Sequence, residues 1–351
     1  MKWWNSRGWG AILWPLTLPY LVGVNLRKRL YSHIFYSHCL NAKVISVGNI
    51  TVGGTGKTPL VEKIAKMLQA DGHRVAVLSR GYGRMGKGVI VVSNGKEVRG
   101  KWEETGDEPF LLARRLPGIP VVVGKNRVEA GRLAVQQWGC GVLLLDDGFQ
   151  HMKVKRDLDL ITMDAENPWG NKRLLPAGPL REPLSSVKRA DAVILTQAHE
   201  TRSAEKIKTK LHTYTSAPVF TAIHRPVEWV SLKDKMTFPV RFLRRKKVLA
   251  FAGIGNPQSF YTTLETLELD VFRFFIYKDH HNYSKRDQRR IFQEAVNRGV
   301  QAVVTTEKDA VRFPDVPESK IPVYYLRIEI EIEQGIQELK AMLNSIFQSS
   351  E

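Results

Sequence analysis

The sequence predicts an α/β fold in which a parallel sheet is covered by helices on both faces. From residue 43 onward, short β-branched or apolar runs alternate with stretches of helical periodicity. This rhythm is typical of parallel strands joined by crossover helices. A glycine-rich loop stands between the first strand and the first helix of the series. With 351 residues, 43% of them hydrophobic, the chain is long enough for a large core and a smaller companion lobe.

The predicted elements form two groups along the chain. In the first group, strands are expected at residues 43–47, 74–78, 120–123, 142–145, 158–163 and 192–196, and helices at 59–71, 108–116 and 126–138. In the second group, strands are expected at 248–251, 271–276 and 302–305, and helices at 257–267 and 285–298. Extended segments at 219–232 and 321–332 are expected to pair as a two-stranded connector between the groups, and an amphipathic helix is expected at 334–347.

Five segments follow from this pattern. They are an N-terminal basic, apolar, membrane-associating segment (1–35), a core that carries the glycine-rich loop (36–217), a connector (218–247), a smaller α/β lobe (248–320), and a return strand with the C-terminal helix (321–351).

The first 35 residues combine basic and apolar side chains and contain no acidic residue. A spanning helix needs about 20 consecutive apolar residues, whereas the apolar stretch 11–24 is shorter and is interrupted by Pro15 and Pro19. We therefore expect this segment to lie on a membrane surface rather than to cross it. Two alternatives stay open, a helix docked on the protein's own core and a cleaved signal peptide, although no convincing cleavage site follows.

The formal net charge is +18, from 53 basic and 35 acidic residues. Such a charge attracts anionic partners, and it does not choose among nucleic acid, anionic lipid and phosphorylated metabolites. Cys39 and Cys140 are the only cysteines. Two cysteines are too few for a disulfide framework or a thiolate metal site, so a reducing compartment fits best.

The segment 46–59 reads Ser-Val-Gly-Asn-Ile-Thr-Val-Gly-Gly-Thr-Gly-Lys-Thr-Pro. Because it follows a strand and precedes a helix, it fits a Walker A loop, whose backbone N–H groups face phosphates. Lys57 would reach the β- and γ-phosphates of ATP, and Thr58 would offer its hydroxyl to Mg²⁺. Thr51 replaces the usual first glycine, so the strict pattern is not met. The predicted nucleotide-binding residues are those of the loop, Thr51, Val52, Gly53, Gly54, Thr55, Gly56, Lys57 and Thr58.

A Walker B strand is apolar and ends in a carboxylate near this loop, and Val-Leu-Leu-Leu-Asp-Asp at 142–147 has that pattern. Asp146 is the first choice for holding Mg²⁺, directly or through water. Asp147 is expected to share the metal or to position the nucleophile. The alternative is that both acids cap the turn that follows, since Asp before Gly is a common turn pair.

Further motifs accompany the loop along nearly the whole chain. They are Ser-Arg-Gly-Tyr-Gly-Arg at 79–84, Gly-Asp-Glu-Pro at 106–109, Leu-Asp-Asp-Gly-Phe-Gln-His at 145–151, Leu-Pro-Ala-Gly-Pro-Leu-Arg-Glu-Pro at 175–183, Ala-Phe-Ala-Gly-Ile-Gly-Asn-Pro at 250–257, Asp-His at 279–280 and Thr-Thr-Glu-Lys-Asp-Ala-Val at 305–311. No single motif suffices, but the set resembles the tetraacyldisaccharide 4′-kinase family, and the basic, apolar N-terminus fits the same resemblance.

The resemblance implies a P-loop kinase core and an activity of lipid A biosynthesis. The γ-phosphate of ATP would pass, with Mg²⁺, to the 4′-hydroxyl of a tetraacylated glucosamine disaccharide 1-phosphate. The enzyme would be peripheral or monotopic at the cytoplasmic face of the bacterial inner membrane, in contact with its anionic surface. Neither nucleic acid nor an obligate protein partner is expected.

The resemblance also assigns roles to residues outside the loop. It implies that Asp107 activates the acceptor hydroxyl with His280 as its partner, although His281 is an alternative. A bare sequence would not have paired them, and Asp107 also suits a helix N-cap. Arginines grip phosphates through paired hydrogen bonds, so the arginines of the matching segments are assigned to the acceptor phosphate or ATP, and Glu182 to the metal. Those arginines are Arg80, Arg127 and Arg181.

Three other functions compete with this interpretation. One is a different P-loop enzyme, such as another small-molecule kinase or a GTPase, although no Asn-Lys-x-Asp motif follows the expected strand. The second is a nucleic-acid-dependent ATPase, which would combine a P-loop with strong positive charge, but the sequence lacks a basic stripe with interleaved aromatics outside 241–247. The third is a membrane protein that uses ATP only as a conformational switch.

Overall fold

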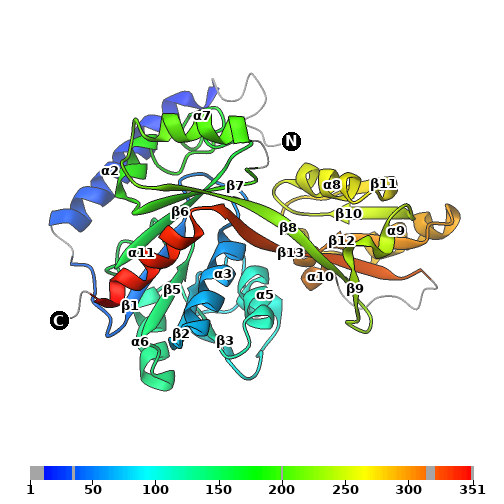
Figure 1. Ribbon diagram of the computed structural model, residues 1–351, viewed down its shortest axis with the longest axis horizontal. Coiled ribbons are helices and arrows are strands. Elements are labelled where there is room, and N and C mark those ends of the chain that lie inside the picture. Colours follow the sequence, from blue (N-terminus) through cyan, green and yellow to red (C-terminus); the bar gives the residue numbers. More distant parts are fainter. Residues whose placement is uncertain (1–11, 34–35, 199–200, 314–320, 349–351) are drawn as a thin grey trace. The chain divides into compact units, whose positions relative to one another are not determined.

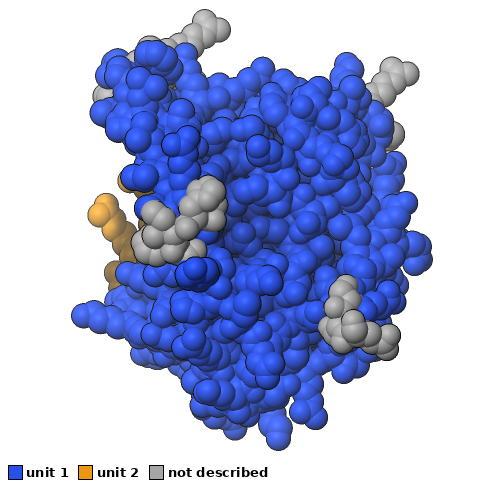
Figure 2. All heavy atoms as spheres, turned by 90° about the vertical axis from the view of Figure 1, so that its left-hand side faces the viewer, with its two compact units in different colours: residues 1–223, 330–351 blue, residues 224–329 orange. Residues whose placement is uncertain are grey.

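The computed structural model describes residues 12–33, 36–198, 201–313 and 321–348. The chain forms two compact units, unit 1 with residues 1–223 and 330–351 and unit 2 with residues 224–329. Figure 1 labels their elements, and Figure 2 colours the atoms of each unit.

The sheet of unit 1 is mostly parallel. Its strands are β1 (Lys43–Gly48), β2 (Val75–Ser79), β3 (Ile90–Asn94), β4 (Pro120–Val123), β5 (Val142–Asp146), β6 (Leu158–Asp164) and β7 (Ala192–Thr196). The order is β7-β6-β1-β5-β2-β4-β3, in which only β3, at the edge, is antiparallel to its neighbour. The central strands are buried along their whole length, as the apolar runs predict for a sheet covered on both faces.

Helices cover both faces of this sheet (Figure 1). On one face, α3 (Lys57–Ala70), α5 (Asp107–Arg115) and α11 (Ile336–Gln348) share a core with the alternate strand residues that include Ile45 and Val77. On the other face, the core includes α6 (Arg127–Trp138), and a neighbouring core includes α7 (Thr201–Leu211) and the 3₁₀ turn η3 (Leu184–Arg189). This arrangement confirms the predicted α/β class.

Unit 2 is a smaller α/β unit with its own core. Its elements are β9 (Thr237–Pro239), η4 (Val240–Leu243), β10 (Lys247–Ala252), α8 (Pro257–Thr266), β11 (Asp270–Ile276), α9 (Lys285–Asn297), β12 (Ala302–Thr306) and α10 (Glu307–Arg312). The strands β11, β10 and β12 pair in parallel, and β13 (Val323–Gln334) continues the sheet beside β12. Thr306 is the N-cap of α10, and its side chain accepts a hydrogen bond from the N–H of Asp309.

The chain passes between the units along two long strands, β8 (Val219–Ser231) and β13. These strands correspond to the two segments expected as a connector, and they are neighbours in the strand order. The sequence did not predict β3 or the short helix α4 (Trp102–Thr105). Both lie between β2 and α5, where an antiparallel edge strand interrupts the regular alternation of strand and helix on which the prediction depended.

The N-terminal segment is described from residue 12, and residues 1–11 and 34–35 lie outside the described residues. It forms the 3₁₀ turn η2 (Trp14–Leu16) followed by α2 (Thr17–His33), drawn in blue in Figure 1. Large apolar side chains of this segment are more than half exposed, namely Ile12, Trp14, Leu16, Leu18, Val22 and Leu26. Among the described residues, no helix combines the length and apolar character needed to cross a bilayer.

Candidate active site

The candidate site residues of unit 1 come from loops at one edge of its sheet. Parallel strands end at the same edge, and β1, β2, β4 and β5 are followed directly by the glycine-rich loop, Arg80, the turn before Arg127, and Asp147. Because α5 runs back from this edge, its first residue, Asp107, belongs there as well. The fold therefore gathers predicted residues that lie far apart in the sequence.

The glycine-rich loop has the backbone shape that phosphate binding needs. Gly53 and Gly56 have φ of 119° and 76°, which other residues adopt only with strain, and Gly56 is the N-cap of α3. Strand β6 and the loop around residue 179 support the glycine-rich loop. The Thr55 hydroxyl is 2.7 Å from that of Thr162, and the Val52 N–H donates to the Pro179 carbonyl at 2.8 Å. The start of α3 thus presents free N–H groups and Lys57 on a fixed frame.

Asp147 lies in the turn after β5 with φ of 54° and binds two cations. Arg181 Nη1 lies 2.9 Å from both of its carboxylate oxygens, and Lys57 Nζ lies 3.7 Å from Oδ1. Burial alone would raise the pKa of Asp147, but these two cations hold it below its usual value. The carboxylate is therefore ionised and tied to the phosphate-binding lysine.

Asp146 differs from its neighbour, because it is buried and only partly satisfied. It is 2% exposed, and its Oδ2 accepts a hydrogen bond from Ser79 Oγ at 3.1 Å. Its Oδ1 has no hydrogen-bond partner within the described ranges. Burial first, and then the charges of Glu108 and Asp147, raise the pKa of this carboxyl. An unsatisfied carboxylate oxygen beside a phosphate loop fits a hard divalent cation, and the buried hydroxyl of Thr58 fits the same ion.

Arg80, Arg84 and Arg127 form a cluster of arginines near the two aspartates. Arg127 is 3% exposed, and its Nε finds no hydrogen-bond partner in the part of the chain that the structure describes. Burial lowers the pKa of Arg127 to about 10, with Asp146 opposing this shift and Arg80 adding to it. Arg84 Nη1 is also buried without a partner in the same described part. Buried guanidinium groups with unsatisfied N–H donors are stabilised strongly by an anion whose oxygens accept their hydrogen bonds.

Asp107 is 6% exposed and is the first residue of α5, after the N-cap Gly106. Its Oδ1 accepts a hydrogen bond from the N–H of Glu108 at 2.9 Å. Asp107 is therefore not the N-cap itself, but its carboxylate stabilises the first turn of α5 through this hydrogen bond. Glu108 contributes to the raised pKa of Asp146, so the start of α5 lies close to the end of β5.

The contacts of Glu182 differ from those expected of a metal ligand. Its carboxylate is buried and lies 2.7 Å from Lys28 Nζ and 2.8 Å from Arg189 Nη2. It also accepts a hydrogen bond from Gln150 Nε2 at 3.2 Å. Burial would raise the pKa of Glu182, but the charges of Arg189 and Lys28 lower it. These contacts favour a role in holding the surrounding loop, and the metal role of Glu182 stays a prediction.

His280 belongs to unit 2, and the geometry around it separates it from His281. His281 Nε2 lies 3.1 Å from Asp287 Oδ2, and its ring stacks on Tyr277 with centroids 4.6 Å apart. The side chain of His280 is 36% exposed, and its backbone, at φ 58°, donates to the Gly253 carbonyl at 3.0 Å. His281 is therefore held by Asp287 and Tyr277, whereas His280, whose Nε2 lies 3.8 Å from Asp279 Oδ1, is the more exposed of the two, at 36% against 28%. Because Asp107 and His280 lie in different units, their pairing stays a prediction.

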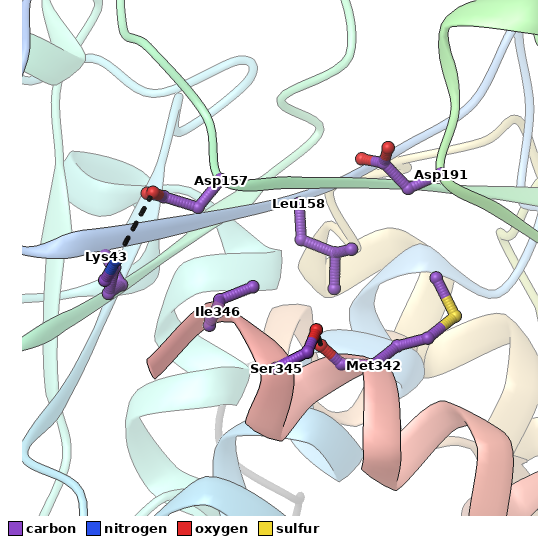
Figure 3. A pocket seen from close by; sticks show the side chains of 7 residues that line it. All are labelled: Lys43, Asp157, Leu158, Asp191, Met342, Ser345 and Ile346. Carbon is purple, nitrogen blue, oxygen red and sulfur yellow. Dashed lines mark hydrogen bonds and ion pairs between the residues drawn. The ribbon is translucent and has the colours of Figure 1, made fainter. Parts of the chain in front are cut away.

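A hollow of unit 1 lies at the opposite edge of the sheet (Figure 3). It has a volume of about 380 Å³ and contains none of the predicted site residues. Strands β1 and β6 begin there, and three residues of α11 face Leu158 across it. Its lining residues are Lys43, Asp157, Leu158, Asp191, Met342, Ser345 and Ile346.

Sequence reasoning missed three residues that the geometry connects to the site. Arg84 and Gln150 lie inside quoted motifs, so the motifs identified their segments but not their roles. Lys28 was expected only as one of the basic residues of the N-terminal segment. Its contact with Glu182 joins residues 154 positions apart, and no local pattern predicts such a pair.

Comparison with known proteins agrees with this geometry. A model of the tetraacyldisaccharide-1-P 4′-kinase family matches residues 9–348. The tetraacyldisaccharide 4′-kinase of Syntrophus aciditrophicus is 42% identical over 333 residues, which cover 92% of this chain and 89% of that protein. The enzyme of Desulfatibacillum aliphaticivorans is 38% identical and covers 97% and 94%. Among solved structures, LpxK from Aquifex aeolicus in complex with ATP has a TM-score of 0.78 at 32% identity, covering 96% of this chain and 99% of that one. The chain therefore belongs to the tetraacyldisaccharide 4′-kinase family.

Proposed function

We propose that this protein is an ATP-dependent kinase of lipid A biosynthesis that phosphorylates the 4′-hydroxyl of a tetraacylated glucosamine disaccharide 1-phosphate. The observation that carries the proposal is the family match over residues 9–348, which includes both units. The phosphate loop, Asp146 and the arginine cluster at one edge of the unit 1 sheet support phosphoryl transfer as the reaction class. The competing nucleic-acid ATPase has no comparable support.

In the proposed reaction, the acceptor oxygen forms a bond to the γ-phosphorus while the bond from that phosphorus to the β–γ bridging oxygen breaks. The hydroxyl proton passes to the carboxylate of Asp107, and ADP leaves. Lys57 and the N–H groups of the loop stabilise charge on the phosphates. His280 assists Asp107 once both substrates are bound.

Thr58 and Asp146 are the residues that would hold Mg²⁺. When bound, the ion would supply neutralising charge to the β- and γ-phosphate oxygens. The orphaned Oδ1 of Asp146 is the structural observation that supports this assignment. Asp147, held by Lys57 and Arg181, keeps the lysine beside the loop before the nucleotide binds.

Arg80 and Arg127 bind the anionic group of the acceptor in this proposal. Their cluster contains buried N–H donors without partners among the described residues, and a phosphate supplies several acceptor oxygens at once. Arg181 is engaged with Asp147, so its link to the substrate is indirect.

We further propose that α2 rests on the anionic surface of the cytoplasmic face of the inner membrane. Its exposed apolar residues have no cover from the described part of the protein, and the substrate carries four acyl chains that belong in a bilayer. Basic side chains near such a surface add about 1 kcal/mol each.

The proposed activity is tested by incubating the purified protein with Mg-ATP and a tetraacylated disaccharide 1-phosphate in detergent. We expect a bisphosphorylated lipid and ADP in equal amounts. The Lys57→Met variant is the control for contaminating kinases and should form both products at least about 10²-fold more slowly. ADP formation without a phosphorylated lipid would contradict the proposal and favour an ATP-driven switch.

The membrane contact is tested with vesicles that contain anionic phospholipid. Val22 on α2 and Val296 on α9 are matched, at 64% and 61% exposure. We expect Val22→Glu to weaken vesicle binding at least about tenfold, because it loses apolar burial and adds like charge. Val296→Glu should bind like the unmodified protein, and equal loss in both variants would contradict a contact through α2.

A further inference from the structure

Helix α2 makes polar contacts with the rest of unit 1, while Leu18, Val22 and Leu26 are more than half exposed. Tyr20 Oη donates to the Arg181 carbonyl at 2.9 Å, and Arg27 Nη2 donates to the Gln150 carbonyl at 3.0 Å. Lys28 Nζ binds Glu182 Oε2 at 2.7 Å and also donates to Ser186 Oγ. All these partners lie in two loops, the one after β5 and the one from residue 181 to η3. The helix is therefore fastened to the loops that surround the phosphate site.

Glu182 is the centre of these contacts. Its side chain is 3% exposed and takes cations from two directions, Lys28 from α2 and Arg189 from η3. A buried carboxylate of this kind is strongly destabilising if one partner is removed, because the charge stays buried. Lys28 is itself 22% exposed, so its charge is largely committed to Glu182 rather than to the surface.

A chain of hydrogen bonds continues from Glu182 toward the phosphate loop. Gln150 Nε2 donates both to Glu182 Oε1 at 3.2 Å and to the carbonyl of Asn49, just before the loop, at 2.9 Å. The other amide atom, Gln150 Oε1, accepts from Arg181 Nη1 at 3.4 Å. Arg181 Nη1 in turn holds both oxygens of Asp147. The side-chain amide therefore joins the α2 contact to the carboxylate beside Lys57.

The distances at Asp147 indicate what this chain does. Asp147 is closer to Arg181, at 2.9 Å, than to Lys57, at 3.7 Å. As long as Arg181 keeps the carboxylate, Lys57 is only loosely paired and stays available for the phosphates. If Arg181 moves away, Asp147 has Lys57 as its remaining cation, and the lysine must be taken from a tighter ion pair before it can bind ATP.

We propose that α2 is part of the nucleotide site, with Lys28 as a positioning residue that sets Gln150 and Arg181 through Glu182 and so keeps Lys57 free to bind ATP. The helix that meets the membrane is thereby coupled to the phosphate loop. This inference builds on the proposed function, but its consequence for nucleotide binding does not require that the lipid be the substrate. A contiguous path of contacts is not by itself coupling, so the test measures coupling directly.

The test compares Lys28→Met with Arg29→Met in a nonionic detergent without anionic lipid. Both variants remove one positive charge from α2, but Arg29 is exposed and Lys28 holds Glu182. We expect Lys28→Met to raise the Kd for Mg-ATP about tenfold, with the KM for the lipid unchanged, and Arg29→Met to match the unmodified protein. Lys28→Arg should restore most of the affinity, since it can still pair with Glu182.

A double-mutant cycle tests the path itself. If the hydrogen-bond path couples α2 to the loop, the two substitutions break the same connection. The double variant Lys28→Met with Gln150→Ala should then raise the Kd for Mg-ATP by much less than the product of the two single fold-changes. Should Lys28→Met not fold, Tyr20→Phe removes only the hydroxyl that holds the Arg181 carbonyl and should raise the Kd by a smaller factor.

Three results would overturn the inference. They are an unchanged Kd for Mg-ATP in folded Lys28→Met and Tyr20→Phe, equal effects of Lys28→Met and Arg29→Met, and strictly multiplicative effects in the cycle. A failure of lipid phosphorylation would instead contradict the proposed function, and nucleotide affinity could still be measured.

Discussion

The two edges of the unit 1 sheet differ in how completely their polar groups are satisfied. The amino edge has the hollow of about 380 Å³, and its acids accept hydrogen bonds, Asp157 from the N–H of Val44 and Asp191 from that of Asp159. Asp159 Oδ1 is the exception at this edge, because it is buried without a partner among the described residues. The carboxyl edge has buried polar atoms without partners among the described residues. These atoms are Arg84 Nη1, Arg127 Nε, Asp146 Oδ1 and His151 Nε2. These unmet donors and acceptors gather around the predicted phosphate site.

The largest effect that this comparison predicts is at Asp107. We expect Asp107→Asn to lower kcat by about 10²- to 10⁴-fold, since an amide keeps the shape but cannot take the hydroxyl proton. The Kd for Mg-ATP should change little. Steady-state phosphorylation of the lipid in detergent, with nucleotide binding measured separately, checks both expectations. Retained activity would mean that Asp107 serves only the first turn of α5.

The two neighbouring histidines provide a matched control for the same step. We expect His280→Ala to lower kcat in the same direction as Asp107→Asn. His281→Ala should mainly lower the free energy of unfolding, because it loses the contacts with Asp287 and Tyr277. The reverse assignment of the two effects would contradict the proposed partner of Asp107.

A third prediction compares one lysine from each edge of the unit 1 sheet. Lys57→Met removes a cation that meets charge as it develops on the phosphates, and we expect kcat to fall by about 10²- to 10³-fold. Lys43→Met removes a cation from the hollow at the amino edge, where it lies 3.9 Å from Asp157, and should leave kcat unchanged. If Lys43→Met also impaired turnover, the hollow in Figure 3 would have a function that its satisfied groups do not indicate.

Much of the fold could be predicted because its signals are local. Apolar runs that alternate with helical periodicity gave the parallel sheet of unit 1, and the loop before Lys57 followed from glycine positions and the strand before it. The antiparallel β3 was missed because it departs from that alternation. Local periodicity cannot indicate which strand an edge strand pairs with.

The site was predictable only as far as motifs name residues. The resemblance gave Glu182 a metal role, which stays a prediction, and no motif indicates the contacts that Glu182 makes in the fold. Its actual partners, Lys28 and Arg189, depend on where α2 packs, which is a tertiary fact. The membrane contact of the N-terminal segment stays a prediction, and the pairing of its Lys28 with Glu182 is a second tertiary fact that the sequence did not indicate.

The last prediction concerns the free energy of unfolding at acidic pH and the buried His151 at the carboxyl edge. Burial, with Arg127, Arg27 and Arg156 nearby, lowers the pKa of His151 from 6.5 to about 3. Below pH 6.5 the unfolded chain binds a proton at this residue and the folded protein does not, so stability present above pH 6.5 is lost as pH falls. At pH 5 the loss is about 2 kcal/mol, from 1.36 kcal/mol for each pH unit.

Urea unfolding between pH 7.5 and 5 can isolate this contribution by comparison with His151→Gln, which cannot titrate. We expect the difference in unfolding free energy between the two proteins to shift by about 2 kcal/mol in favour of His151→Gln at pH 5. The exposed His38 offers the matched control, His38→Gln, for which this burial argument does not hold. Parallel stability curves for His151→Gln and the unmodified protein would mean that His151 accepts its proton in the folded state. In that case water would reach His151 at the carboxyl edge more readily than its burial indicates.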